Sequence, residues 1–123
     1  MFCRQLDLVP PTDPRMIEGA VYMRGRPLKA GRLDYYYLYY GTLALYQYQG
    51  EIWEQWNEKM KDVLTKAQVK TGPCAGSWNV SSEWHGGRMG RAVTTAFATL
   101  SLEVYYRILP MYGLRKGDEQ GGE

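Results

Sequence analysis

Apolar residues recur at three- and four-residue intervals in four stretches of the chain, which is the period of an amphipathic α-helix. This pattern predicts helices over residues 14–24, 34–48, 51–69 and 90–109. Asp13 and Asp34 are typical N-cap residues, Pro14 suits a first helical position, and Pro110 prevents the last helix from continuing. We therefore expect an all-α fold built of helical hairpins.

Two of the predicted helices have one apolar and one polar side. The helix over 51–69 has the stronger pattern, with Asp62 and Lys66 spaced for an ion pair on its polar side. Its apolar face carries Ile52, Trp53, Trp56, Met60, Val63, Leu64 and Ala67. The helix over 14–24 has a weaker apolar face, made of Ile17, Val21 and Tyr22. Both are expected to lie on the outside of the fold.

The other two helices are apolar around most of their circumference. Seven of the eleven tyrosines fall between Tyr35 and Tyr48. The helix over 90–109 has an apolar stripe and a second face of small or polar residues, and we expect the stretch 86–110 to be a central helix with neighbours on several sides. The stripe is Val93, Phe97, Leu100, Val104 and Ile108, and the second face is Ala92, Ala96, Thr99 and Glu103.

The order along the chain is therefore outer, inner, outer and inner helix. This alternation predicts a two-layered arrangement, in which amphipathic helices cover apolar ones. We expect an entry segment over 1–12, one domain over 13–112 and a frayed tail over 113–123. The long connection 74–90, rich in glycine and serine, suggests a loop at the rim of a site.

Composition is typical of one globular domain: 123 residues, 45% hydrophobic and 23% charged. The net charge of +2 comes from basic residues spread along the chain, so no basic stripe indicates nucleic acid. Charged residues interrupt the most apolar windows, which argues against a transmembrane segment, and the first residues lack the apolar core of a signal peptide. A cytoplasmic location is the default expectation. Cys3 and Cys74 are then two free thiols, with a disulfide as the alternative.

Three segments resemble the terpenoid cyclase and protein prenyltransferase superfamily, whose domains are α/α toroids. They are YYLYYGTLALYQ at 36–47, LTKAQVKTGPCAGSW at 64–78 and GRAVTTAFATLSLEVYYRILP at 90–110. The middle segment is similar to the squalene cyclase repeat in which a helix-ending Gln precedes a Gly-x-Trp turn, here Gln68, Gly76 and Trp78. The Gln-to-Gly spacing is longer than the family's. The likeness is strongest to bacterial proteins with prenyltransferase or squalene oxidase repeats.

The resemblance implies a structural role for these three residues, since the Gln amide would bond to backbone and stack on the indole. A family toroid takes about twice this length or more, and such repeats need neighbours to bury their apolar faces. We therefore expect a C-terminal piece of a toroid, a truncated reading frame, or a subunit completed by self-association.

The family's catalytic signatures are missing from this sequence. It has no Asp-x-Asp-Asp acid motif. A zinc site of the prenyltransferase type would need an Asp two residues before Cys74, where Gly72 stands, and a His near Thr94, whereas His85 lies on the loop. No metal or cofactor is therefore expected. Glu83 and Glu103 as a glycosidase pair are less favoured than a solvated and a hydrogen-bonded side chain.

Two functions remain open: a non-catalytic binding or scaffold module, which we favour, and one wall of an isoprenoid site completed by a longer chain or an oligomer. The second would use aromatic faces to stabilise carbocations, although tyrosines also pack helix joins. The residues expected to line an apolar cavity are Tyr36, Tyr40, Thr95 and Glu103. Arg88 and Arg91, after Gly86 and Gly87, are the expected diphosphate contacts, with plain loop glycines as the alternative.

Overall fold

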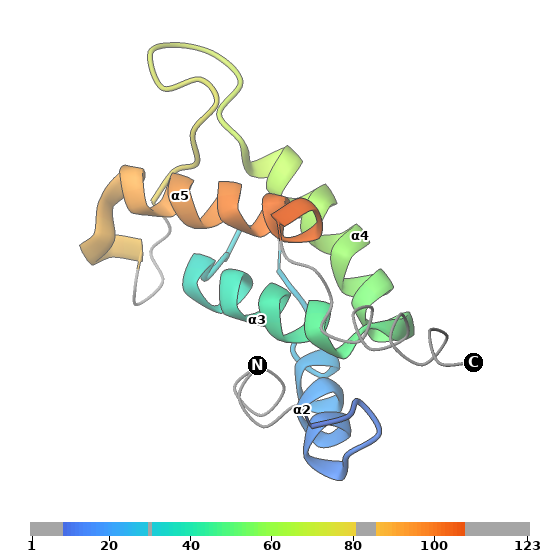
Figure 1. Ribbon diagram of the computed structural model, residues 1–123. Helices are drawn as coiled ribbons and strands as arrows, with labels where there is room; N and C mark the ends of the chain where they lie inside the picture. The colour runs from blue at the N-terminus through green and yellow to red at the C-terminus, as the bar shows by residue number, and fades with distance from the viewer. Residues whose placement is uncertain (1–8, 30, 81–85, 108–123) are drawn as a thin grey trace.

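The protein is seen in a computed structural model that describes residues 9–29, 31–80 and 86–107, with only the backbone of 86–89. These residues form four helices and no strand (Figure 1). The all-α prediction is confirmed, and the predicted boundaries are met within a few residues, except the predicted end at 109, which lies outside the described residues. The helices are α2 (Pro14–Arg24), α3 (Tyr35–Tyr48), α4 (Gly50–Ala67) and α5 (Gly86–Arg107).

The helix starts follow the predicted capping chemistry. The Asp13 carboxylate accepts a hydrogen bond from the backbone N–H of Arg15 at 2.9 Å. Asp34 Oδ1 accepts from the N–H groups of Tyr36 and Tyr37, at 3.0 and 3.1 Å. Each carboxylate thus binds backbone donors that have no partner within the helix. None of the helices in the described ranges has the length and hydropathy needed to cross a membrane.

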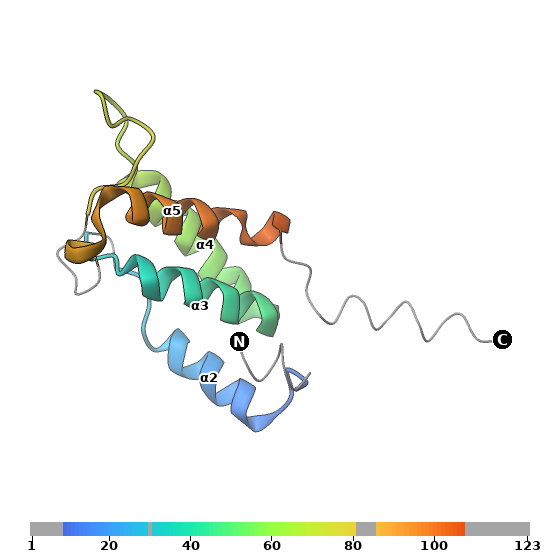
Figure 2. The ribbon, with the colours of Figure 1, turned by 60° about the vertical axis from the view of Figure 1, so that its left-hand side comes forward.

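Helix α3 lies at the centre of the fold, in contact with α2, α4 and α5 (Figures 1 and 2). Leu38 and Thr42 are fully buried. Helix α4 packs on α3 through its tryptophans: Trp53 meets the ring of Tyr46 edge-on at 5.1 Å, and Trp56 Nε1 donates to Thr42 Oγ1 at 3.0 Å. The predicted apolar face of α4 is therefore the face that is buried.

Helix α5 corrects the expectation that 86–110 is the central helix. It packs mainly on α3 and leaves Val93 exposed, together with Ala92, Ala96 and Thr99. The side that meets α3 is also made mostly of small residues, which let the two helix backbones approach closely. Two of the buried residues, Thr94 and Ser101, also donate their hydroxyls to carbonyls of their own helix. The buried positions of α5 are Thr94, Ala98, Ser101 and Val104.

Helix α2 also turns a different face inward than its sequence pattern predicts. Ile17, Val21 and Tyr22 are exposed, whereas Met16 and Ala20 are buried. Close packing again explains the difference. Across the junction of α2, α3 and α4, a Cβ at Gly41 would lie 2.6 Å from Met23 Cε, so α2 approaches α3 where α3 has no side chain.

Helices α3 and α5 run in the same direction, and α4 returns between them in the opposite sense (Figures 1 and 2). Helix α4 contacts both of its neighbours in the chain, α3 more extensively than α5. The described part of the chain thus contains two parallel helices and a covering antiparallel one. The predicted tail 113–123 and Ile108 lie outside the described residues, as do 1–8 of the predicted entry segment.

Candidate functional site

The connection from α4 to α5 begins with a closed turn between Gln68 and Trp78. These two residues form an antiparallel bridge. Val69 N–H donates to the Ser77 carbonyl at 2.9 Å, and Gly76 N–H donates to the Val69 carbonyl at 2.8 Å. Gly76 has φ of 86°, a left-handed value that favours glycine. The turn is therefore an ordered piece of backbone, with the free thiol of Cys74 exposed on it.

The three residues predicted as a repeat motif come together in this turn. Gln68 Nε2 donates to the Gly76 carbonyl at 3.0 Å. Trp78 is buried, and its Nε1 donates to the Leu64 carbonyl at 2.8 Å, in the last turn of α4. The indole thus ties the turn to the last turn of α4, at a carbonyl that also accepts the Gln68 backbone N–H at 3.1 Å, and the amide closes the turn itself.

Two residues expected at a ligand site bind this turn instead. Thr95 Oγ1 accepts from the backbone N–H of Trp78 at 3.2 Å, and Arg91 donates to Ser77 Oγ at 3.1 Å. Gly90, at φ 72° and ψ 174°, breaks the helical path just before them. The start of α5 is therefore fastened to the end of α4. Arg88, the other expected diphosphate contact, has no described side chain, and 81–85, with Glu83 and His85, lie outside the described residues.

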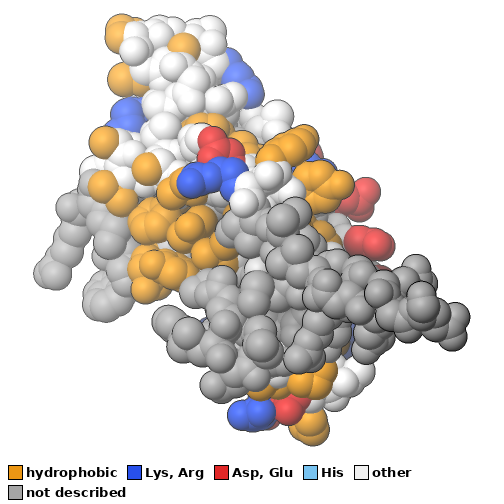
Figure 3. All heavy atoms as spheres, viewed as in Figure 1, with side chains coloured by type: hydrophobic (Ala, Val, Ile, Leu, Met, Phe, Trp, Pro, Cys, Tyr) orange, Lys and Arg blue, Asp and Glu red, His pale blue; other side chains and the backbone are white. Residues whose placement is uncertain are grey.

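Tyr36 and Tyr40 belong to an aromatic cluster where α3 meets α5. Their ring centroids are 4.6 Å apart, and Tyr36 meets Phe97 edge-on at 6.0 Å. Tyr39 lies deeper, 5.5 Å from Phe97. Tyr36 and Tyr40 are each 40% exposed and Val93 is 38% exposed. Hydrophobic side chains gather on this side of the molecule, over α3 and α5 (Figure 3). We call Tyr36, Tyr40, Val93 and Phe97 the aromatic face.

The aromatic face lies on the side of α3 away from α4. Thr42 points to α4, since it accepts the hydrogen bond of Trp56. Tyr40 precedes Thr42 by two residues, which is a rotation of about 200° around a helix. Tyr36 lies one turn before Tyr40 and shares its side. If α4 belongs to an outer layer of helices, the aromatic face is on the inner side of α3, away from that layer.

The chemistry of the aromatic face is that of apolar contact. Tyrosine rings offer large flat surfaces with a polar edge, suited to an apolar partner or to a cation above the ring. Glu103, predicted as a fourth lining residue, does not join the cluster: it forms an ion pair with Arg107 at 3.1 Å. Of the four predicted lining residues, Tyr36 and Tyr40 are therefore brought together, and Thr95 and Glu103 lie elsewhere.

A groove between α2 and α3 adjoins this face at Tyr40 and was not foreseen from the sequence. Its volume is about 430 Å³, and its walls are mostly apolar. The spacing of apolar residues in α2 did not predict this groove, because it placed Val21 and Tyr22, which are exposed, on the face expected to meet the fold. The lining residues are Arg15, Met16, Gly19, Ala20, Tyr22, Met23, Tyr37, Tyr40, Gly41, Ala44, Leu45 and Tyr48.

Within the part of the chain that the structure describes, no three His, Cys, Asp or Glu side chains gather in a way that could hold a metal ion. No family model matches the chain, and no match was found among curated proteins or solved structures. The functional argument therefore depends on the geometry described above.

Proposed function

We propose that this chain is part of an α/α toroid, similar to squalene cyclase and prenyltransferase repeats, and that it acts as a binding or scaffold module rather than as a catalyst on its own. In this proposal α3 and α5 are successive inner helices and α4 is the outer helix between them. The aromatic face then lines the inside of the ring.

The arrangement of α3, α4 and α5 supports this proposal. A toroid repeat needs inner helices that run in parallel and an outer helix that returns between them, as these three do (Figure 2). It also needs a joint between an outer helix and the next inner one. Here the Gln68 amide closes the turn by binding Gly76, the Trp78 indole binds the end of α4, and Thr95 binds the same turn from α5.

The observation that carries the proposal is the exposure of the aromatic face on the side opposite α4. Apolar surface of this kind is costly in water and marks a place where something else binds. No acid cluster or metal ligand set lies among the four residues of the face, so contact rather than catalysis is the chemistry that they offer.

Binding of an apolar fluorescent dye tests the proposal. The double variant Tyr36→Ser with Tyr40→Ser should bind the dye at least several-fold more weakly than the native chain. The matched control is Tyr105→Ser with Tyr106→Ser, which removes two tyrosines that are 61% and 85% exposed but lie outside the aromatic face and the groove beside it. Equal binding by the two double variants would contradict the proposal.

The second candidate is one wall of an isoprenoid cyclase or prenyltransferase site, completed by further repeats or by an oligomer. The specific observation in its favour is the tilted ring pair Tyr36 and Tyr40 beside Phe97, because aromatic faces stabilise carbocations. A panel of squalene and isoprenoid diphosphates distinguishes the two functions. Turnover of any of these compounds by the chain would favour the enzyme. A chain that neither binds nor turns over any of them would leave the enzyme without support.

A further inference from the structure

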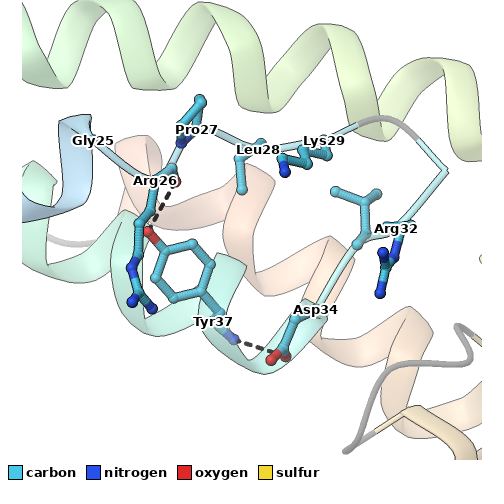
Figure 4. A pocket seen from close by; sticks show the side chains of 9 residues that line it. Gly25, Arg26, Pro27, Leu28, Lys29, Arg32, Asp34 and Tyr37 are labelled. Carbon is cyan, nitrogen blue, oxygen red and sulfur yellow. Dashed lines mark hydrogen bonds between the residues drawn. The ribbon is translucent and has the colours of Figure 1, made fainter.

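Positive charge is concentrated in the connection between α2 and α3. Four of the fifteen Lys and Arg residues fall within 24–32. Three of them, Arg26, Lys29 and Arg32, line a pocket of about 480 Å³ (Figure 4). The remaining lining residues are Gly25, Pro27, Leu28, Leu33, Asp34 and Tyr37.

The two ends of the connection that carries these cations are held against the fold. The Tyr37 hydroxyl donates to the Arg26 carbonyl at 3.1 Å, which fastens the start of the connection to α3. Leu28 and Leu33 are buried in the core on either side of Lys29 and Arg32. A pocket on a fixed frame loses less conformational entropy when it binds a ligand than a loose loop would.

The three cations lie on different sides of the pocket. In Figure 4 Arg26 and Arg32 lie on opposite sides, and Lys29 extends between them. The Arg26 guanidinium lies over the Tyr22 ring, 4.7 Å from its centroid, a contact that steadies it without neutralising its charge. Asp34 is the one carboxylate of the lining, against three cations.

We propose that this pocket binds a phosphate-bearing anion, and a diphosphate better than a monophosphate. Guanidinium and ammonium groups are the side chains that bind phosphate oxygens, and cations on separate sides suit two linked phosphates. Pro27, Leu28 and Leu33 give the pocket an apolar part beside its charges. The site is separate from the aromatic face, and the proposal does not depend on the proposed function.

Titration calorimetry with inorganic pyrophosphate at low ionic strength tests the site. The native chain should bind pyrophosphate, and Arg26→Gln with Lys29→Gln should weaken binding at least tenfold. The matched control, Arg24→Gln with Lys59→Gln, removes the same charge from exposed positions outside this pocket. Backbone amide shifts should move at 28–33 in the native chain, a readout that does not depend on any variant folding.

Sedimentation with vesicles distinguishes the source of the phosphate. If vesicles containing phosphatidic acid also bind, with the same loss in Arg26→Gln with Lys29→Gln, the site accepts a lipid headgroup; if pyrophosphate alone binds, the ligand is soluble. The proposal is overturned if pyrophosphate does not bind, if inorganic phosphate binds as tightly as pyrophosphate, or if the two double variants bind pyrophosphate equally well.

Discussion

Thr42 is the residue that joins the central helix to α4 by a single hydroxyl. Its Oγ1 donates to the Leu38 carbonyl at 2.7 Å and accepts from Trp56 Nε1 at 3.0 Å. The side chain is fully buried, so both bonds form out of reach of solvent. A hydroxyl suits this place because it is a donor and an acceptor at once.

Replacing Thr42 by Val should lower the free energy of unfolding by about 1–3 kcal/mol, since the Trp56 N–H would remain buried without its acceptor. Urea unfolding measures the change. Thr65→Val is the matched control, because Thr65 makes the same bond within its helix, to the Lys61 carbonyl at 2.7 Å, but is exposed. Its effect should stay within about 0.5 kcal/mol. Equal losses in the two variants would contradict the role given to Thr42.

The candidate site shows what residue patterns can and cannot predict. Tyr36 and Tyr40 are one turn apart on a helix, so a shared face followed from the period alone. Thr95 depends on how α5 is rotated against α3, which no period gives. Thr95 binds the backbone N–H of Trp78, and these two residues are distant in sequence.

Among the helices, the buried face was predicted correctly where charged residues clearly mark the opposite face. Helix α4 has charged residues that are costly to bury, so its inner face was set by its own sequence. Helices α2 and α5 have few such residues on their competing faces. In α2 and α5 the buried side includes small residues such as Ala20 and Ala98. How closely such residues pack depends on the surface of the partner helix, which the pattern of a single helix does not show.

Gly41 offers a test of that close fit. An added Cβ would meet Met23 Cε at 2.6 Å and the Trp56 ring at 3.0 Å. The Met23 end can move, but the Trp56 ring is held by its bond to Thr42. We expect overpacking of about 1–3 kcal/mol in Gly41→Ala to outweigh a gain in helix propensity of about 1 kcal/mol.

Gly19→Ala provides the comparison, because Gly19 lies within α2 and a Cβ there would meet nothing within 4 Å. This variant should gain about 0.5–1 kcal/mol of stability from helix propensity alone. Thermal or urea unfolding of both variants gives the answer. A stabilised Gly41→Ala would show that α2 and α4 do not pack against α3 as tightly as described.

The core of the molecule includes the buried Tyr35 and Tyr46, with Tyr37 half-buried against it, and this makes its stability sensitive to alkali. Burial raises the pKa of Tyr35, Tyr37 and Tyr46 above the ordinary value of 10.0. The folded state therefore favours the neutral phenol. The resulting stability is present below pH 10 and is lost as the pH rises through the raised pKa values.

The free energy of unfolding should accordingly fall above pH 10, and Tyr35→Phe with Tyr46→Phe should reduce the steepness of that fall. Denaturant unfolding at a series of pH values between 8 and 11 measures it. Tyr106→Phe serves as the control, because Tyr106 is 85% exposed. An identical pH dependence in the buried double variant and the native chain would contradict this account.

The alternation of polar and apolar helices predicted the all-α class and the inner place of α3. It could not predict whether further repeats complete the structure, because that depends on surfaces outside the pattern of each helix. The aromatic face is such a surface. Its exposure is the reason for our proposal that the described helices are part of a larger arrangement.

Molar mass by light scattering over a wide range of concentration tests this claim most directly. The account predicts that the native chain associates, so that its mass rises above the 14.2 kDa of one chain as concentration increases. Tyr36→Ser with Tyr40→Ser should stay at 14.2 kDa. A native chain that remains a monomer at every concentration, or a serine variant that associates equally, would contradict the claim that the aromatic face is a surface made to be covered.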